Sequence, residues 1–259
     1  MRIARFTTGE EPRYGVLGTD DDEGVIAALI GDPLYQGVEP TGERVAVDDV
    51  RLLAPVIPRS KVVCVGRNYA DHAAELGNDL PEEPLLFLKP NTSVVGPGDP
   101  ISYPRQSNDV QYEGELAVVI RRICRDVPAE RATDVVFGFT VGNDVTARDL
   151  QRKDVQFTRA KGFDSFCPLG PWVETDLDFA DLEVTTTLNG DVRQQGRTSQ
   201  MIFDVPTLIA HITSVMTLLP GDVILTGTPA GVGAMQPGDD VAVTVEGIGT
   251  LTNKVVSRD

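Results

Sequence analysis

The sequence contains few cysteines and no long apolar run. Its three cysteines, Cys64, Cys124 and Cys167, lie far apart and form no CxxC pair, which excludes the common zinc-finger spacing and gives no sign of a disulfide framework. No apolar stretch reaches the roughly 18 residues that span a bilayer, and the start, MRIARFTTGE, lacks the apolar core of a signal peptide. We therefore expect a cytoplasmic protein without a membrane partner.

Basic residues are also scarce. Lys and Arg together number 23 against 39 Asp and Glu, so the formal net charge is -16. Nucleic acids and anionic membranes attract clustered positive charge, and we expect neither as a partner. Hydrophobic residues make up 41% of the 259 positions, which is enough for a core, and this length suits one large domain with or without a small one.

Short β-branched segments make up most of the pattern. Residues 1–58 alternate in the manner of hairpin strands and end in APVIPRS, which predicts a small β-rich N-terminal domain before a larger domain over residues 59–259. One long helix is predicted over 204–218, with Asp204 as its N-cap, and a shorter one over 68–77. Strands and helices do not alternate regularly, so we predict a mostly β, α+β fold with a mixed sheet.

The stretch QYEGELAVVI (111–120) places two glutamates at the start of a buried strand pattern. With a period of two, Glu113 and Glu115 point to the same face as Ala117. Two negative charges buried on one face lose their hydration and repel each other, and both effects cost free energy. The next strand, VVFGFTVGND, ends in Asp144. Three carboxylates at strand ends suit a hard cation such as Mg²⁺, Mn²⁺ or Ca²⁺, although an E-x-E pair beside a turn is more often a solvated strand end.

Three further residues are candidates for proton transfer and charge stabilisation. His72 and Glu75 are three apart in the predicted short helix, and a carboxylate that holds one imidazole nitrogen makes the other a general base; the alternative is a surface pair. Lys161, in the loop AKGFDSFCPLGP, could stabilise an oxyanion or neutralise the acidic cluster. For His211, in the long helix, packing or an interface is the expected role.

Another group of residues suggests recognition of an anionic ligand. Arg148 and Gln151 follow Asp144 at i+4 and i+7, which predicts one face of a helical turn that starts at Asp144. The arginine could bind a substrate carboxylate or pair with the nearby acids. The turn LTGTPAGVG (225–233) lacks both the GK[ST] ending and the G-x-G-x-x-G pattern of nucleotide sites, so Thr228 is interpreted as a donor to a small anion.

The motifs together resemble those of the fumarylacetoacetate hydrolase family. They are, in order, VCVGRNYADHAAELG, LFLKPNTSVVGPGDPI, YEGELAVVI, GFTVGNDVTARDLQ, AKGFDSFCPLGPW and MIFDVPTLIAHITSVMTLLPGDVILTGTPAGVG. The resemblance covers about residues 58–255, and the N-terminal piece is similar to the small variable domain of these proteins. It implies a mixed β-sandwich roll, usually a homodimer, with Mg²⁺ or Mn²⁺ (Ca²⁺ as a further option) held by Glu113, Glu115 and Asp144.

The resemblance also implies roles for the other candidates. His72 and Glu75 match the dyad that activates water, Lys161 matches the lysine of the KGFD segment, and the substrate-contacting residues match Arg148, Gln151 and Thr228. Fumarylacetoacetases carry a further acidic metal ligand upstream of the histidine, and VCVGRNY offers none. The chain is therefore more similar to the smaller bacterial members.

These members cleave or rearrange 2-oxo acids, and the expected substrate is such an acid. The expected reaction is hydrolysis of a C–C bond in an acylpyruvate-type substrate, or decarboxylation of an oxaloacetate-like one, through a metal-bound enolate. The first alternative is an isomerase of 2-hydroxyhepta-2,4-diene-1,7-dioate or a decarboxylase of 5-carboxymethyl-2-oxo-hex-3-ene-1,7-dioate in aromatic catabolism. A remote alternative is a non-catalytic binding protein on the same fold.

Overall fold

Short strands carry most of the fold, as the β-branched segments predict. The computed structural model describes residues 1–19, 22–75, 77 and 79–257. The strands are β1 (Arg2–Thr7), β2 (Arg13–Leu17), β3 (Val25–Leu29), β4 (Pro40–Ala46), β5 (Arg51–Leu53), β6 (Val62–Gly66), β7 (Leu85–Lys89), β8 (Val94–Val95), β9 (Ile101–Tyr103), β10 (Val110–Tyr112), β11 (Gly114–Ile120), β12 (Val136–Asn143), β13 (Thr146–Ala147), β14 (Cys167–Glu174), β15 (Glu183–Leu188), β16 (Asp191–Arg197), β17 (Val223–Leu225), β18 (Gly233–Ala234), β19 (Asp240–Val245) and β20 (Gly249–Ser257).

Helices are few and short among the described residues. The α-helices are α1 (Pro33–Gln36), α2 (Ala70–Glu75), α3 (Arg148–Asp154), α4 (Thr158–Lys161) and α5 (Val205–Val215), and the 3₁₀ turns include η2 (Val47–Asp49), η3 (Asn91–Ser93), η4 (Ala129–Val135) and η5 (Thr198–Gln200). None of the helices in this part of the chain has the length and apolarity to cross a membrane. The mostly β, α+β fold is confirmed.

The strands form three sheets. The largest has the order β4-β3-β2-β1-β14-β12-β11-β17-β6-β7, with β5 beside β1 and β8 beside β14; it mixes antiparallel pairs with the parallel pairs β17–β6 and β14–β8. A second sheet has the order β16-β15-β19-β20-β9, and a small third has the order β13-β10-β18. Strand order does not follow chain order, which is the arrangement of a mixed roll rather than of a simple meander.

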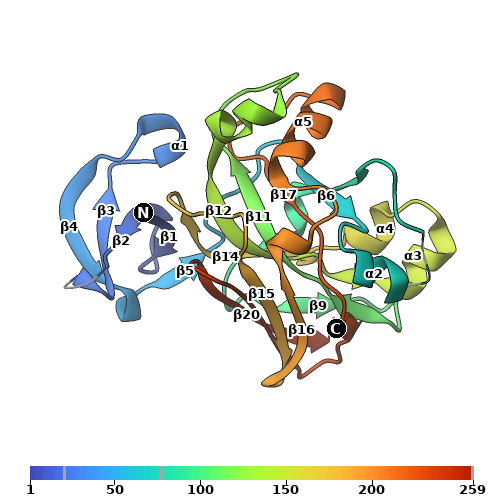
Figure 1. The fold of residues 1–259 in the computed structure, drawn as a ribbon. Helices are drawn as coiled ribbons and strands as arrows, with labels where there is room; N and C mark the ends of the chain where they lie inside the picture. Colours follow the sequence, from blue (N-terminus) through green and yellow to red (C-terminus); the bar gives the residue numbers. More distant parts are fainter. Residues whose placement is uncertain (20–21, 76, 78, 258–259) are drawn as a thin grey trace.

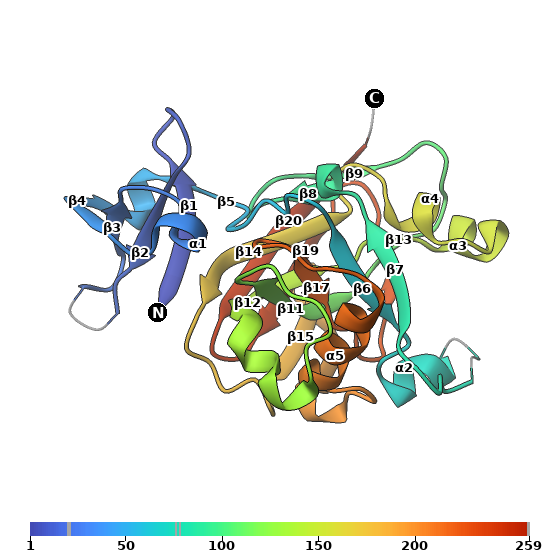
Figure 2. The same cartoon turned by 90° about the horizontal axis from the view of Figure 1, so that it is seen from above.

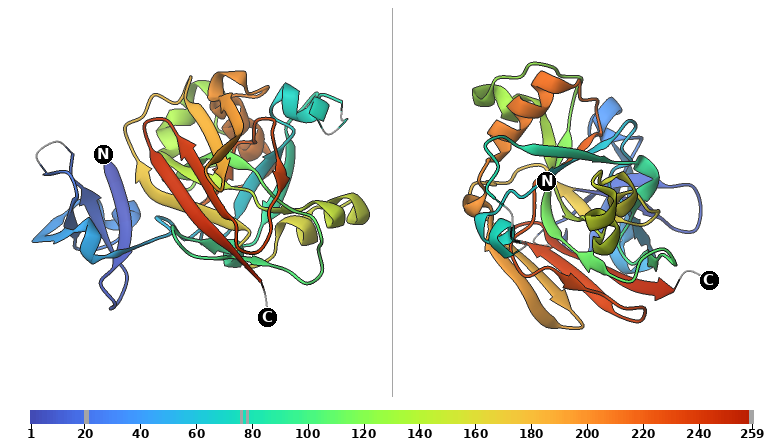
Figure 3. Two further views of the ribbon diagram at one scale, coloured as in Figure 1. Left: turned by 90° about the horizontal axis from the view of Figure 1, so that it is seen from below. Right: turned by 90° about the vertical axis from the view of Figure 1, so that its right-hand side faces the viewer.

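The N-terminal strands β1–β5 stand to one side of the other elements (Figures 1 and 2). Figure 3 shows the same separation from below, with the first strands in blue. The two parts nevertheless share a sheet, because Arg2 and Ile3 of β1 pair with Glu174 and Val173 of β14. The domain boundary at residues 58 and 59 stays a prediction.

Strand β11 is buried on both faces, as its sequence predicts. Leu116, Val118 and Ile120 enter one apolar cluster with α5 and the second sheet. Ala117 and Val119 enter another cluster, between β6, β14 and β17. The period of two therefore places Glu113 and Glu115 on the Ala117 side, where both side chains are largely buried.

The long predicted helix is confirmed as α5. Its N-cap is Asp204, whose side chain accepts a hydrogen bond from the Thr207 backbone N–H, and Pro206 stands in the first turn. The helix ends at Val215, a little before the predicted end at 218. Figure 1 shows α5 beside β11 and β17, while α2, α3 and α4 gather at the end of the molecule opposite the N-terminal strands.

Candidate metal centre and its cavity

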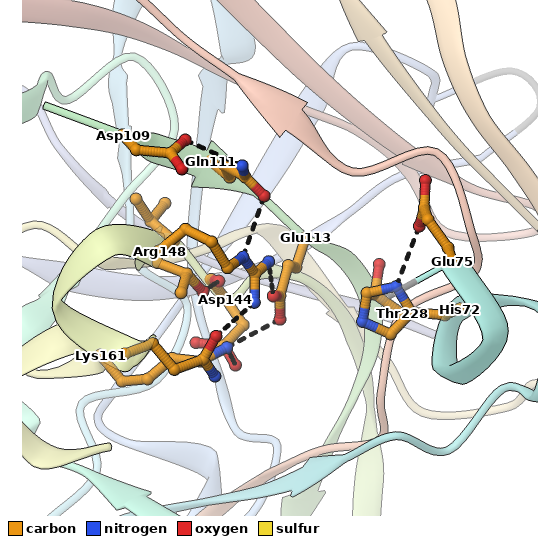
Figure 4. Close-up of polar contacts among 12 residues, drawn as sticks. His72, Glu75, Asp109, Gln111, Glu113, Asp144, Arg148, Lys161 and Thr228 are labelled. Carbon is orange, nitrogen blue, oxygen red and sulfur yellow. Dashed lines mark hydrogen bonds and ion pairs between the residues drawn. The ribbon is translucent and has the colours of Figure 1, made fainter. Parts of the chain in front are cut away.

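Most of the predicted site residues line a single cavity of about 380 Å³. The nine candidates come from loops, strands and helices far apart in the chain, and eight of them are lining residues: His72, Glu75, Glu113, Glu115, Arg148, Gln151, Lys161 and Thr228. The ninth, Asp144, lies directly behind, bonded to Lys161. Figure 4 shows His72 and Glu75 of α2 on one side of Glu113, and Arg148 and Lys161 of α3 and α4 on the other.

The three predicted carboxylates come together. Oxygen atoms of Glu113, Glu115 and Asp144 lie within 4.8 Å of one another, and all three side chains are buried. The pairing of β11 with β12 causes this, because Gly114 faces Asn143 across the ladder, so that the residues beside each of them become neighbours. The Asp144 backbone N–H also donates to the Glu113 carbonyl at 2.8 Å.

Gly114 permits this close approach. A Cβ atom at this position would lie 2.2 Å from Oγ1 of Thr186 on β15 and 2.8 Å from a methyl carbon of Val243 on β19. Only glycine therefore lets the start of β11 contact the second sheet, and the two flanking glutamates depend on that contact for their position.

Two of the carboxylates are neutralised by buried cations. Lys161 Nζ bridges Glu113 Oε2 at 2.8 Å and Asp144 Oδ2 at 2.7 Å. Arg148 donates to the other Glu113 oxygen, and Lys89 to the other Asp144 oxygen. Burial alone would raise the pKa of Glu113, but Lys161 and Arg148 outweigh it and hold this pKa well below its ordinary value.

The third carboxylate, Glu115, has no cationic partner among the described residues. Its Oε2 accepts only the Gly227 backbone N–H, at 2.7 Å, which the left-handed backbone of Gly227 (φ 99°) directs toward it. Burial, with the charges of Asp144 and Glu113, raises the pKa of Glu115 well above its ordinary value. A buried carboxylate without a partner is costly, and a hard divalent cation that binds all three acids would remove the cost. The residues therefore fit such an ion.

The His72–Glu75 dyad forms as predicted. His72 Nδ1 lies 3.3 Å from Glu75 Oε2, and Glu75 also accepts the Gly231 backbone N–H. The imidazole is buried, although it lines the cavity. Figure 4 shows its second ring nitrogen on the side of Glu113, away from Glu75. This nitrogen is positioned to exchange a proton with a ligand in the cavity.

Arg148 is held by three side chains beside the cavity. Its Nε donates to Gln111 Oε1, one terminal nitrogen to Gln151 Oε1, and the other to Glu113. The structure shows the ion pair with a nearby acid, the alternative to substrate binding. Arg148 also lines the cavity, and its predicted contact with a substrate carboxylate stays a prediction. The predicted helical turn from Asp144 is wrong, because β13 intervenes and α3 begins at Arg148.

The remaining predicted site residues, Gln151, Lys161 and Thr228, all line the cavity. Gln151 accepts from Arg148, so its amide N–H groups remain for a ligand, and its predicted role stays a prediction. Lys161 neutralises the acidic cluster, one of its two predicted roles. Thr228 donates its hydroxyl hydrogen to the Gly114 carbonyl at 2.8 Å. The hydroxyl hydrogen is engaged within the protein here, and the predicted contact of Thr228 with a small anion stays a prediction.

Two buried residues of the site have no counterpart in the sequence predictions. Lys89 follows the apolar run LLFL, and its position before Pro90 gave no sign that its amine reaches Asp144. Gln194 on β16 is fully buried; its Oε1 accepts the Gly114 N–H at 3.0 Å, and its Nε2 donates to Thr228 Oγ1 and the Pro229 carbonyl, both at 2.7 Å. The Gln194 amide thereby links Gly114, which lies between the two glutamates, to the turn whose Gly227 backbone N–H donates to Glu115.

The comparison with known proteins identifies the fold and the family. The family model for the fumarylacetoacetate hydrolase C-terminal region matches residues 61–256, and a model named Rv2993c-like, N-terminal, matches residues 1–55. The chain belongs to the fumarylacetoacetate hydrolase family. Members of this family are enzymes that depend on a divalent metal, and the buried acidic triad is a set of residues able to bind one.

Relatives and solved structures cover from about three quarters of the chain to all of it. Protein Rv2993c of Mycobacterium tuberculosis is 58% identical, over 100% of this chain and 99% of its own length. The mitochondrial oxaloacetate decarboxylase of Dictyostelium discoideum is 45% identical, over 73% of this chain and 90% of its own. The structure of 5-carboxymethyl-2-hydroxymuconate delta-isomerase from Mycobacterium smegmatis is 51% identical over the full length of both chains, with a TM-score of 0.92. The predicted family group is thereby confirmed.

We predict that Glu115→Gln greatly weakens binding of Mg²⁺ or Mn²⁺. Loss of a residue behind a metal ligand typically weakens binding about 10- to 100-fold, and loss of the ligand itself should exceed this. The metal-free variant should be at least as stable as the parent, because the substitution removes a buried carboxylate that has no cationic partner. Calorimetric titration and thermal unfolding measure the two effects, with exposed Glu130→Gln as the control. Unchanged affinity would refute the assignment.

Gln194→Leu should weaken cation binding by about 10- to 100-fold, because Gly114 and the 227–229 turn lose their common hydrogen-bond partner. Gln195→Leu is the matched control, since Gln195 is the next residue on β16 and is exposed. Affinity is measured per folded molecule at a temperature where circular dichroism shows each variant intact. A loss of stability in Gln194→Leu without a loss of affinity would limit Gln194 to packing.

Proposed function

We propose that this protein is a divalent-metal-dependent enzyme that cleaves a C–C bond in a 2-oxo acid. The observation that carries the proposal is the buried Glu115, which has no cationic partner among the described residues and shares a cavity with a histidine whose second nitrogen is free of Glu75. Mg²⁺ and Mn²⁺ are the proposed ions, because carboxylate oxygens suit both.

The chain's own residues have separate tasks in this reaction. Glu113, Glu115 and Asp144 would hold the cation, which when bound supplies a Lewis acid for the oxygens of a 2-oxo acid. The buried ammonium of Lys161 pairs with Glu113 and Asp144, and these acids outweigh burial to raise the pKa of Lys161 above the ordinary value. His72, oriented by Glu75, would move a proton to or from the substrate or water.

Two cleavage reactions fit this arrangement. In hydrolysis of an acylpyruvate, His72 removes a proton from water, the hydroxide attacks the distal carbonyl, and the enolate of pyruvate leaves. In decarboxylation of an oxaloacetate-like acid, carbon dioxide leaves without activated water, and the same enolate is then protonated. The similarity to the Dictyostelium oxaloacetate decarboxylase supports the second reaction.

Isomerisation is the second candidate function. An isomerase of a 2-hydroxymuconate-type dienoate, in the catabolism of aromatic compounds, also passes through an enolate and needs a proton carrier in place of activated water. The His72–Glu75 dyad supplies such a carrier, and the similarity to the Mycobacterium smegmatis isomerase supports this use. The two functions differ in the product, which an assay identifies directly.

Product assays with three substrates test the proposal: oxaloacetate, acetylpyruvate and 2-hydroxyhepta-2,4-diene-1,7-dioate, each with Mg²⁺ or Mn²⁺ and again after chelation. We expect metal-dependent turnover of at least one. His72→Asn should slow hydrolysis or isomerisation about 100- to 10,000-fold and spare decarboxylation. His211→Asn, which changes the other histidine of the sequence, is the control. Turnover of all three unaffected by chelation would contradict the proposed function.

A second copy of the chain is the proposed partner, as the family resemblance implies. Exposed apolar side chains such as Leu85 and Leu88, on the edge strand β7, support an association surface near the cavity. Light scattering after size exclusion should give twice the 27.9 kDa mass of one chain. A mass equal to that of one chain across a range of protein concentrations would contradict the dimer.

A further inference from the structure

One cationic side chain of the cavity has no task in the proposed reaction. Arg67 follows β6 directly and precedes α2, the short helix that carries His72. It is half-buried and lines the cavity together with Glu113, Glu115 and His72. The motif VCVGRNY contains it, and neither the metal centre nor the dyad uses it.

The backbone of Arg67 is unusual. Its φ of 57° lies in the left-handed region, which residues other than glycine seldom adopt and which costs free energy. Such conformations concentrate at binding and catalytic sites, where the surrounding structure holds them. The strain is therefore consistent with a functional position for this side chain.

The other basic residues of the cavity are engaged by carboxylates. Lys161 bridges Glu113 and Asp144, Arg148 pairs with Glu113, and Arg152 lies 3.5 Å from Asp109. Arg67, by contrast, makes no ion pair and no side-chain hydrogen bond with any residue that the structure describes. It is the cation of this cavity that remains for an anionic ligand.

We infer that Arg67 binds a second carboxylate of the substrate, so that the preferred substrates are dicarboxylic 2-oxo acids. This inference rests on the proposed function, in which the first carboxylate and the 2-oxo group lie at the acidic triad. The guanidinium offers paired N–H donors that match a carboxylate. An acylpyruvate, which ends in a neutral ketone, gives Arg67 no such partner.

The charge balance of the site supports a dianion. The cavity and the residues bonded to it contain as many acidic as basic side chains, namely Glu75, Asp109, Glu113, Glu115 and Asp144 against Arg67, Lys89, Arg148, Arg152 and Lys161. A divalent cation adds two positive charges to this neutral set. Two substrate carboxylates restore neutrality, whereas the single carboxylate of an acylpyruvate leaves one positive charge uncompensated in a half-enclosed space.

The test compares oxaloacetate with acetylpyruvate, which differ at the distal end. Arg67→Met should raise KM for oxaloacetate about tenfold or more, because a charge-assisted hydrogen bond to the bound substrate is lost; kcat should not fall, because the carboxylate that Arg67 holds leaves as carbon dioxide. It should change KM for acetylpyruvate less than about twofold, and Arg67→Lys should restore part of the loss. Arg152→Met is the matched control, since it removes a cation of the same cavity that already has a carboxylate partner; it should affect both substrates equally.

Equilibrium binding separates this inference from the proposed function. Calorimetry with the metal-loaded protein should show tighter binding of 2-oxoglutarate than of pyruvate, and Arg67→Met should abolish the difference. That result would support Arg67 even if no substrate were turned over, in which case only the proposed reaction would fail. Equal losses for both members of each pair, or no loss, would overturn the inference.

Discussion

The buried negative charge of three carboxylates is the constraint on which the rest of this structure depends. Glu113 and Asp144 are each paired with two cations, and Lys161 serves both. Glu115 receives one backbone N–H and no cation among the described residues. Buried lysine and arginine side chains thus balance the charges of Glu113 and Asp144, whereas no side-chain cation of the described residues pairs with Glu115. A fully paired cluster would have little affinity for a metal ion, and a fully unpaired one would destabilise the fold.

The fold keeps this cluster in place by joining segments from all parts of the chain. The pairing of β11 with β12 sets the spacing of the acids, and the absence of a side chain at Gly114 lets the second sheet approach them. Gln194 then hydrogen-bonds both the Gly114 backbone and the turn that carries Gly227, and so links the start of β11 to that turn. Because the site is built on strands buried on both faces, its geometry resists small distortions, which is the requirement for tight coordination.

The sequence predicts those parts of the structure that follow a regular period. Alternation along β11 places Glu113 and Glu115 on one buried face, and the helical period with Asp204 as a cap predicts α5. Long-range contacts leave no such pattern. The position of Asp144 at a strand end groups it with the two glutamates, and the family resemblance supports that grouping. Nothing local shows that Arg148 is held by Gln111 and Glu113, or that Lys89 and Gln194 reach the site. Those contacts depend on sheet order, which does not follow chain order.

A division of tasks among the cations follows from these contacts. Lys161 and Arg148 are fixed by acids of the candidate metal centre, and their positions can change only if those acids move with them. Arg67 lies on a connection outside that network, on a backbone held in a strained conformation. Substitutions there can alter which ligand end is recognised without disturbing the carboxylates. In the proposed function, an enolate-forming centre beside an independent recognition residue is an arrangement in which one chemistry can serve decarboxylation, hydrolysis or isomerisation, according to what the substrate presents at its far end.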